Sequence, residues 1–534
     1  MLARHPHRAA LLVLRRFTVR RRHPALCRFE SNGNLEPVSP QTGPQNGPST
    51  NFIQNSFIRD TAFALDTFRR LLKFSLIGVV GIGATAVTAL MAAHLWVEQV
   101  ELAPETDEEV RKWEWDREAD RWTGGATGGT DPGLGTKGRM AVRSAWIAQN
   151  WGTGSAPSVV GSKAYSGRVR SGEGMRAVEA RLEFAQDFLN IAIHTASQKS
   201  QSGNLRPDTI TELIARHANV MERMGTKDAL FEARSEYERV WAGLPGKGID
   251  SARIALKLGD LNHRLGDPED ALAWWARSIQ LAQGSTVLAS VPPAVPASVP
   301  SAPLAQRTLI SNLVSLSAHY ATSGQLRQAR AVEEASLALL RSVKQPESFE
   351  STTPPHALHA LFILHRSSLI SIHLAEVLYA LKEQPAVSVQ WLSRAAESAE
   401  RVALVLTGLP PIHPDAPESQ IPHPPSSEAP LVPAYAKSRT MSRPAGSLLR
   451  DSRRTAAEAW NLMGILVEKS RAKGATEKAL ECYERALGWA GVAADKAGGI
   501  GKAGEGTLET EWKALWANYV RVRDVVRKET ENGK

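Results

Sequence analysis

The residues best suited to chemistry in this chain are three histidines in the stretch PPHALHALFILHR. His356, His359 and His365 fall within one apolar, helix-like run that has no acidic residue close by. Imidazole is a common metal ligand, but a zinc site needs three or four ligands, and the neighbours here are Leu, Ala, Phe and Ile. We therefore expect these histidines to pack in the interior or face solvent, and we predict no metal site.

Two glycine-containing segments resemble nucleotide-binding motifs, but each lacks a feature that the motif requires. Gly133, Gly135 and Gly138 satisfy G-x-G-x-x-G, but a charged, tryptophan-rich segment precedes them where a dinucleotide-binding fold has a hydrophobic strand. The pair Gly501-Lys502 lacks the Ser or Thr of a phosphate-binding loop, and neither H-E-x-x-H nor G-x-S-x-G occurs. The sequence thus predicts a protein that is not an enzyme, with no catalytic residue and no cofactor.

One apolar stretch, residues 74–97, predicts a transmembrane helix. It reads FSLIGVVGIGATAVTALMAAHLWV and contains no Lys, Arg, Asp or Glu. At about 1.5 Å per residue it can cross a hydrocarbon layer of about 30 Å. Small residues recur at every fourth position and would let another membrane helix pack closely. This candidate packing ridge consists of Gly81, Thr85, Ala89 and Ala93.

The flanking charges indicate how this stretch is oriented. Arg69, Arg70 and Lys73 precede it, whereas Glu98 and Glu101 follow it. A positively charged flank stays on the side of the membrane from which the chain is inserted, because such a flank is not translocated readily. Together with the leader described next, they predict a single-pass protein of the mitochondrial inner membrane, with its N-terminus in the matrix and its C-terminal part in the intermembrane space.

Residues 1–30 have the composition of a mitochondrial presequence. Eight arginines are interleaved with Leu, Val and Phe, and the first acidic residue is Glu30. A basic disordered arm is the alternative. Residues 31–58, rich in Pro, Gly, Asn and Ser, predict a disordered linker.

Basic charge is concentrated at this N-terminal end. Residues 1–73 carry twelve Lys and Arg against four Asp and Glu, which accounts for +8 of the net charge of +9. The rest of the chain is nearly neutral and lacks the basic surface that nucleic-acid binding requires, so we predict no nucleic-acid partner. Two cysteines, Cys27 and Cys482, are too few for a disulfide framework or a cysteine-based zinc site.

Residues 98–151 form a tryptophan-rich juxtamembrane segment. A charged helix is expected over residues 106–121 and a loop over residues 124–138. Tryptophan clusters are favoured at interfaces with membranes or proteins, and capping of the helices that follow is an equally good interpretation. The residues concerned are Trp113, Trp115, Trp122, Trp146 and Trp151.

Residues 175–530 read as consecutive helices, and three helix pairs share an internal spacing. A small residue in the first helix is followed by an alanine in the second, after twelve residues in two pairs and fifteen in the third. The pairs are Gly259 with Ala271, Ser317 with Ala329, and Gly464 with Ala479. This spacing resembles the tetratricopeptide repeat (TPR), whose small residues let two helices approach closely. We predict an all-α fold, a TPR-like α-hairpin solenoid preceded by a single transmembrane helix.

Two further features qualify this repeat pattern. An aromatic residue stands four positions after the alanine in the first and third pairs, as Trp275 and Tyr483, whereas the second pair has Glu333. Proline-rich stretches at residues 285–303 and 409–446 interrupt the helices and are expected to be loops, since proline stops helices and withholds a backbone donor.

A solenoid of this kind has a concave groove lined by the first helix of each hairpin. Polar groups on such a surface can hold an extended peptide or a helix of another protein. Six residues point into the groove in the predicted register and are candidates for protein binding, with ordinary solvation as the alternative for each. They are Arg253, Asp260, His263, Glu458, Asn461 and Glu468.

The order of these segments, with KWEWDREADRWTGGATGGTDPGLG after the span, resembles the fungal TPR-containing adaptor subunit of the mitochondrial inner-membrane i-AAA protease. The resemblance implies a quality-control adaptor that binds unfolded or misassembled proteins and presents them for proteolysis. Its partners would be the AAA protease, the substrates of that protease and the lipid bilayer. The alternative is a TPR assembly or import factor for respiratory-chain or intermembrane-space proteins.

Overall fold

The computed structural model describes most of the chain after residue 50. The described ranges are residues 51–118, 122–152, 159–161, 177–244, 246–285, 291–349, 351–409, 430–470, 472–492 and 512–532. The predicted presequence, residues 1–50 as a whole and Gly501-Lys502 lie outside them. The chain divides into two compact units, Met1–Ala84 and Thr85–Lys534, and each is described by itself.

Helix α2 (Asn51–Trp96) begins in the first unit, within the range expected to be linker. Its apolar side chains face outward: Phe74, Val79 and Ile82 are 70%, 68% and 73% exposed. The stretch Leu65–Glu101 has a mean hydropathy of 2.1 over its most apolar window, and none of that window is buried. This helix is long and apolar enough to cross a membrane, in agreement with the predicted single span.

A second helix, α13 (Pro354–Ala380), passes the same test of length and composition, with a mean hydropathy of 1.4. However, 61% of its apolar window is buried inside the protein. Because its apolar side chains already contact protein, we interpret α13 as a core helix of the second unit.

The second unit consists almost entirely of helices. After the π-helical turn η1 (Val97–Glu101) come α3 (Glu108–Lys112), α4 (Trp115–Glu118), η2 (Gly125–Thr127), η3 (Pro132–Leu134), α5 (Gly135–Trp151), α6 (Ala180–Lys199) and η5 (Ser200–Ser202). The array continues with α7 (Thr209–Met224), α8 (Lys227–Gly243), α9 (Ile249–Leu265), α10 (Pro268–Ala282), α11 (Pro303–Thr322) and α12 (Leu326–Arg341). It ends with α13, α14 (Pro385–Thr407), α15 (Pro433–Ala436), α16 (Ser442–Lys469), α17 (Ala475–Ala490) and α18 (Trp512–Asn532). The strands β1 (Val159–Gly161) and β2 (Ala177–Glu179) form a short antiparallel pair.

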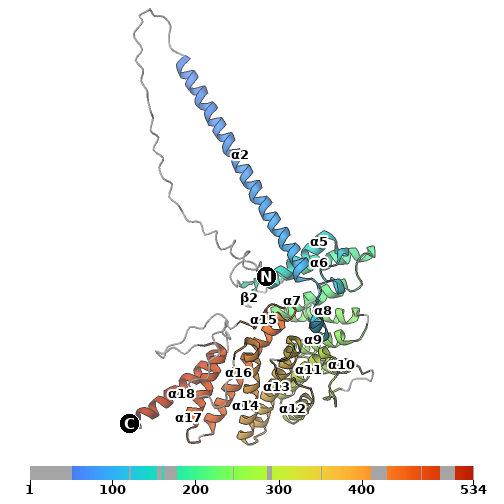
Figure 1. The fold of residues 1–534 in the computed structure, drawn as a ribbon, viewed down its shortest axis with the longest axis vertical. Coiled ribbons are helices and arrows are strands. Elements are labelled where there is room, and N and C mark those ends of the chain that lie inside the picture. The colour runs from blue at the N-terminus through green and yellow to red at the C-terminus, as the bar shows by residue number, and fades with distance from the viewer. Residues whose placement is uncertain are drawn as a thin grey trace, which may run out of the picture. The chain divides into compact units, whose positions relative to one another are not determined.

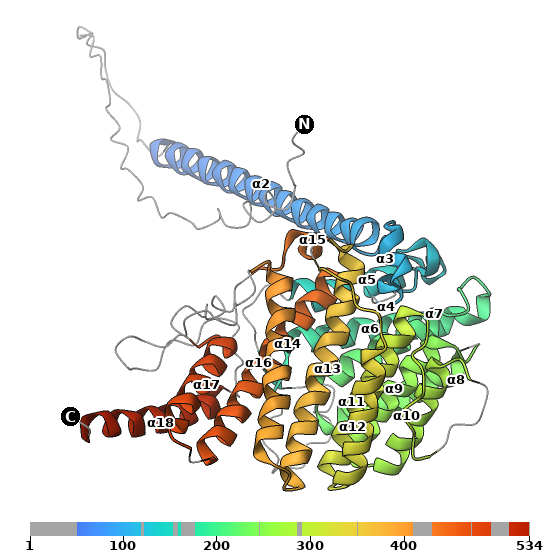
Figure 2. The same ribbon diagram turned by 60° about the horizontal axis from the view of Figure 1, so that its bottom comes forward.

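These helices pack as consecutive antiparallel hairpins. Helices α5 and α6, α7 and α8, α9 and α10, α11 and α12, α13 and α14, and α16 and α17 pair in turn, and each hairpin packs on the next. Figures 1 and 2 show α9 to α14, α16 and α17 packed side by side. The structure confirms the predicted all-α fold with a solenoid of α-hairpins.

The shared spacing seen in the sequence marks places where two helices of a hairpin come close. Gly259 in α9 faces the ring of Trp275 in α10, and Gly464 in α16 faces the ring of Tyr483 in α17. A Cβ added at Gly464 would lie 2.8 Å from Tyr483 Cε1, a separation that real Cβ atoms do not show. Both rings are fully buried, so the glycines create the space that the aromatic side chains fill.

The second pair uses a hydrogen bond where the other pairs use an aromatic ring. Ser317 Oγ in α11 lies 2.9 Å from Glu333 Oε1 in α12 and 2.9 Å from His373 Nδ1 in α13. Burial raises the pKa of Glu333 to about 7 and lowers the pKa of His373 to about 4. Neutral His373 can therefore donate to the hydroxyl while the hydroxyl donates to Glu333. This polar chain replaces the aromatic contact at the same position of the repeat.

The described parts of the two proline-rich stretches differ in helix content. Residues 291–302 are irregular, and α11 begins at Pro303. In the second stretch, α15 forms at Pro433–Ala436 and α16 begins at Ser442, inside the range expected to be loop. Helix α16 thus extends further toward the N-terminus than the proline content suggested.

Two glycines of α16 allow a matched test of the close approach. We expect Gly464→Ala to lower the free energy of unfolding by about 1–3 kcal/mol, because the new methyl group collides with the buried ring of Tyr483. We expect Gly446→Ala to raise it by about 0.5–1 kcal/mol, because Ala is the better helix former. An added Cβ at Gly446 meets only Leu431 Cδ1 at 3.9 Å. Chemical denaturation of the detergent-solubilised protein measures both changes, and shifts of the same sign would contradict the packing described.

The raised pKa of Glu333 predicts that the stability of the protein depends on pH. Its carboxyl pKa is about 7 in the folded protein and 4.5 without the fold, so folding favours the protonated form. Its stabilising contribution is complete below pH 4.5 and is lost as the pH rises through 7, up to about 3 kcal/mol. Glu333→Gln should therefore be more stable than the parent at pH 8 and similar to it at pH 5, as measured by urea denaturation at both values. Equal stabilities at pH 8 would show that the fold does not raise the pKa of Glu333.

Candidate functional site

Residues 102–118, here called the strap, connect the end of the apolar helix to the solenoid by an irregular path. Asp107 caps α3, since its Oδ1 accepts a hydrogen bond from Glu109 N at 2.9 Å. After α3 the chain turns at Glu114, which has a positive φ of 54°, and the short helix α4 follows. This path places successive strap residues against different hairpins.

The strap lies across the N-terminal ends of the first helices of several hairpins. Arg253 of α9 donates from Nη1 to the carbonyl of Arg117 at 2.9 Å. Glu114 Oε2 accepts a hydrogen bond from Leu304 N, near the start of α11, at 2.9 Å. Trp115 Nε1 donates to the carbonyl of Pro355, at the start of α13, at 2.9 Å. One short segment thus ties three hairpins together.

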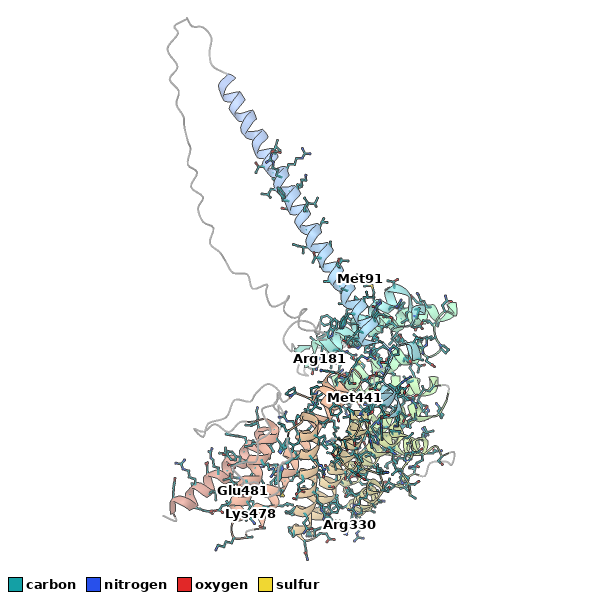
Figure 3. All side chains as sticks on the ribbon, in the orientation of Figure 1. Met91, Arg181, Arg330, Met441, Lys478 and Glu481 are labelled. Atoms are coloured by element: carbon teal, nitrogen blue, oxygen red, sulfur yellow. The ribbon has the colours of Figure 1, made fainter. Side chains whose placement is uncertain are left out.

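The strap reaches the last hairpin through the turn that precedes α16. Arg439 donates to the carbonyl of Pro104 at 3.0 Å, and the hydroxyl of Thr440 bonds to Glu105. Met441 belongs to the same apolar cluster as Val110 and Trp115. In Figure 3, Met441 and Arg330 are labelled at opposite edges of the array. The strap runs along the Met441 edge.

Arg307 in α11 is the centre of these contacts and is only 1% exposed. It donates from Nε to Glu118 Oε2 at 2.7 Å, from Nη1 to the Trp113 carbonyl at 3.1 Å, and from Nη2 to the Glu114 carbonyl at 3.2 Å. Its guanidinium lies 3.9 Å from the centre of the Trp115 ring. Burial lowers the pKa of Arg307, and the carboxylate of Glu118 opposes this change. The charge is kept in the interior because strap groups use each of its nitrogens.

The strap forms one wall of a cavity of about 1090 Å³ within the second unit. The other walls come from the end of α5, from the start and one face of α7, and from α13 and α16. Seven arginines and seven acidic residues line it, so the cavity carries no strong net charge. Aromatic groups are prominent among the lining residues. They are Trp115, Trp122, Trp146, Trp151 and Phe362.

Arg366 of α13 is a candidate contact group inside this cavity. Its guanidinium lies 4.9 Å from the centre of the Phe362 ring, and its Nε is buried without a hydrogen-bond partner among the residues that the structure describes. Burial lowers the pKa of Arg366, whereas the carboxylates of Asp451 and Glu118 raise it. A half-buried guanidinium with an unused donor can hold a carbonyl or carboxylate of a bound molecule.

The six residues predicted to line the groove do not line this cavity, and three of them lie on α9. Besides the Arg253 contact with the strap, Asp260 accepts a hydrogen bond from Trp275 Nε1 at 3.1 Å. Burial raises the pKa of Asp260. His263 Nδ1 lies 3.4 Å from His319 Nδ1. The structure places these side chains in contacts within the chain.

The other three predicted residues lie on α16, where α18 packs beside it. Asn461 Oδ1 accepts a hydrogen bond from Asn518 Nδ2 at 2.9 Å. Glu468 accepts hydrogen bonds from the Tyr483 hydroxyl at 3.0 Å and from Arg521 Nη2 at 2.9 Å. Glu458 is exposed. The structure thus brings the six residues into two separate groups, and their role in protein binding stays a prediction.

The ridge of small residues lies on α2. Gly81, Thr85 and Ala89 are exposed and Ala93 is half-buried. A Cβ added at Gly81 would meet no atom within 4 Å. Packing of this ridge against another membrane helix stays a prediction.

The three histidines of α13 contact three different partners. The ring of His356 stacks on Trp113 with 4.1 Å between the ring centres. His359 Nδ1 accepts from Arg307 at 3.1 Å, and His365 Nε2 lies 3.0 Å from Thr455 Oγ1. Burial lowers the pKa of His359 and that of His365 to about 3 each, which keeps both rings neutral. These rings serve packing and hydrogen bonding between the helices.

The tryptophans of the juxtamembrane segment differ in burial, and a role of the exposed ones at an interface stays a prediction. Trp115 and Trp122 are 1% and 4% exposed and pack inside the second unit. Trp146 and Trp151 meet edge to face with 5.5 Å between their ring centres, and Trp151 is 49% exposed. The sequence showed that these tryptophans are clustered, but it did not show that they line a cavity.

Comparisons with known proteins add little to this description. No family model matches the chain, and no curated protein matches it. Among solved structures, the crystal structure of BtubC (BKLC) from P. vanneervenii is similar at 14% sequence identity, over 52% of this chain and 94% of that chain, with a TM-score of 0.28. A likeness of this degree carries no argument about fold or function.

Arg307→Met tests whether the strap depends on the buried guanidinium. Methionine fills similar space but leaves the carbonyls of Trp113 and Glu114 without their donors. We expect the free energy that favours docking of the strap to fall by about 2–4 kcal/mol. Hydrogen exchange should become faster in residues 108–118, and trypsin should cleave sooner after Lys112. The control is Arg341→Met, at an exposed position of α12. Unchanged exchange in the Arg307 variant would show that the strap is held by other contacts.

Proposed function

We propose that this chain is a membrane-anchored adaptor that binds unfolded or misassembled proteins and presents them to the i-AAA protease of the mitochondrial inner membrane. The stretch Leu65–Glu101 provides the single anchor, and the second unit lies in the intermembrane space. The choice of compartment and of protease rests on the arginine-rich leader and on the resemblance of the segment order to the fungal adaptor.

The observation that carries the binding role is the cavity of about 1090 Å³. Pockets for small molecules usually measure about 300–1000 Å³, so this space is at the upper end of that range and has room for a short polypeptide segment. Its tryptophan rings offer apolar area at little entropic cost, and its paired charges can meet either sign on a bound chain. Such a mixed surface supports the binding of varied clients.

The position of the cavity supports the link to a membrane protease. The strap that forms one wall continues directly from the end of the apolar helix. Val97 is fully buried, and Glu98 accepts a hydrogen bond from Arg139 of α5 at 2.9 Å. Since these contacts fix η1 to the first hairpin, a client in the cavity stays close to the membrane anchor. An inner-membrane protease would meet it there.

Photocrosslinking from within the cavity tests this proposal. A photoreactive phenylalanine analogue at Trp151, which is 49% exposed and lines the cavity, should capture client proteins in isolated mitochondria. The matched control is the same analogue at Phe231 of α8, which is 41% exposed and does not line the cavity. We expect at least fivefold more adducts at position 151, increasing when ATP is depleted.

Two outcomes would overturn the proposal in different ways. Equal adducts at positions 151 and 231 would show that the cavity does not bind clients. If affinity purification in mild detergent recovered respiratory-chain subunits and no AAA protease, the chain would instead be an assembly factor.

A further inference from the structure

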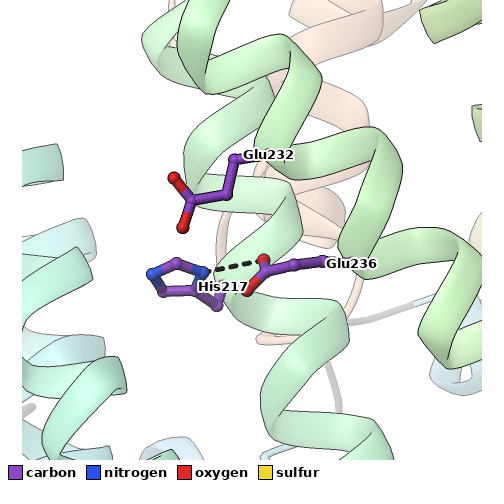
Figure 4. Close-up of side chains that lie close together, drawn as sticks. All are labelled: His217, Glu232 and Glu236. Atoms are coloured by element: carbon purple, nitrogen blue, oxygen red, sulfur yellow. Dashed lines mark hydrogen bonds and ion pairs between the residues drawn. The ribbon is translucent and has the colours of Figure 1, made fainter.

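A second cluster of polar side chains lies away from the cavity, inside the hairpin of α7 and α8. His217 of α7 faces Glu232 and Glu236 of α8, as Figure 4 shows. His217 Nδ1 lies 2.7 Å from Glu236 Oε2, and one ligand-type atom from each of the three residues lies within 4.8 Å of the others. Two ligands of one tetrahedral ion are about 3–3.5 Å apart, so small side-chain movements suffice to place all three around one ion.

The helix register explains why the three side chains meet. Glu232 and Glu236 are four residues apart and so project from the same face of α8. Gly225, with a positive φ of 70°, ends α7, and Thr226 caps α8 through Ala229 N at 3.3 Å. This tight turn sets α7 and α8 antiparallel, so that His217 stands opposite the two carboxylates.

The burial of the cluster makes it unlike an ordinary surface ion pair. His217 is 1% exposed and Glu236 is 8% exposed, while Glu232 is half-buried at the rim. His217 Nε2 is buried and has no hydrogen-bond partner among the described residues. The nitrogen that faces Glu236 is Nδ1, so an ion shared with the glutamates would take the place of the proton in this hydrogen bond. Two carboxylates beside one imidazole in a low-dielectric setting favour the approach of a cation.

We propose that His217, Glu232 and Glu236 bind a divalent first-row transition-metal ion of the zinc class. The mixed nitrogen and oxygen donors suit Zn²⁺, Co²⁺ or Mn²⁺ better than Ca²⁺ or Mg²⁺, which favour oxygen ligands alone. Three protein ligands leave a further position for water. The ion fixes α7 to α8 and thereby stabilises the face of α7 that lines the cavity through Asn219 and Arg223.

Metal titration of the full-length, detergent-solubilised chain tests this site. After treatment with a chelator and removal of any affinity tag, calorimetry with ZnCl₂ should give one site per chain, and CoCl₂ should produce the visible absorption of a low-coordinate Co²⁺ complex. Zn²⁺ should also raise the melting temperature. The absence of saturable binding for both ions would overturn the proposal.

Three variants separate ligation from folding. Glu232→Gln, at the half-buried rim, should fold normally by circular dichroism and bind Zn²⁺ at least tenfold more weakly, and His217→Gln should show the same loss. Glu238→Gln, at an exposed position of α8, is the control and should bind as the parent does. Unchanged affinity in the folded Glu232→Gln variant would exclude that carboxylate as a ligand and with it the three-ligand site.

Discussion

The contact between Arg307 and the strap is the interaction on which the rest of the second unit depends. A guanidinium that is 1% exposed is tolerated only when its donors are satisfied, because an unpaired buried charge is very costly. Here the partners are a carboxylate and two carbonyls of the strap, together with His359 of α13. Helices α11 and α13 and the strap therefore form a single polar junction, and removing any one of them leaves the others unsatisfied.

The hairpin interfaces show that one backbone spacing can be stabilised by different side chains. Gly259 with Trp275 and Gly464 with Tyr483 use a ring that fills the space beside a glycine. Ser317 with Glu333 uses a buried hydrogen bond that extends to His373 of the next hairpin. The contact of a ring with a glycine involves no ionisable atom, whereas the contact at Ser317 is made by the carboxyl group of Glu333. The array thus uses both apolar and polar contacts at the same position of the repeat.

The sequence was sufficient to predict the features that arise from local order. Helix periodicity and the absence of charges over residues 74–97 predicted the all-α fold and the apolar span, because these follow from residues close together in the chain. The strap could not be predicted in this way. Trp115 bonds to Pro355 across 240 positions of sequence, and Arg307 reaches Glu118 across 189. Nor could the hydrogen bonds from α18 to Asn461 and Glu468 of α16 be predicted from a periodic pattern.

The strap contributes both to the cavity and to the junction at Arg307. Trp115 and Glu118 line the cavity, and the same two residues contact Arg307. A ligand that binds the cavity better with the strap docked must, by thermodynamic linkage, stabilise the docked strap by the same free energy. A ligand that binds better when the strap is undocked must favour the undocked strap and thereby weaken the contacts with Arg307. Because the strap begins where the apolar helix ends, occupancy of the cavity is coupled to the segment that joins the solenoid to that helix.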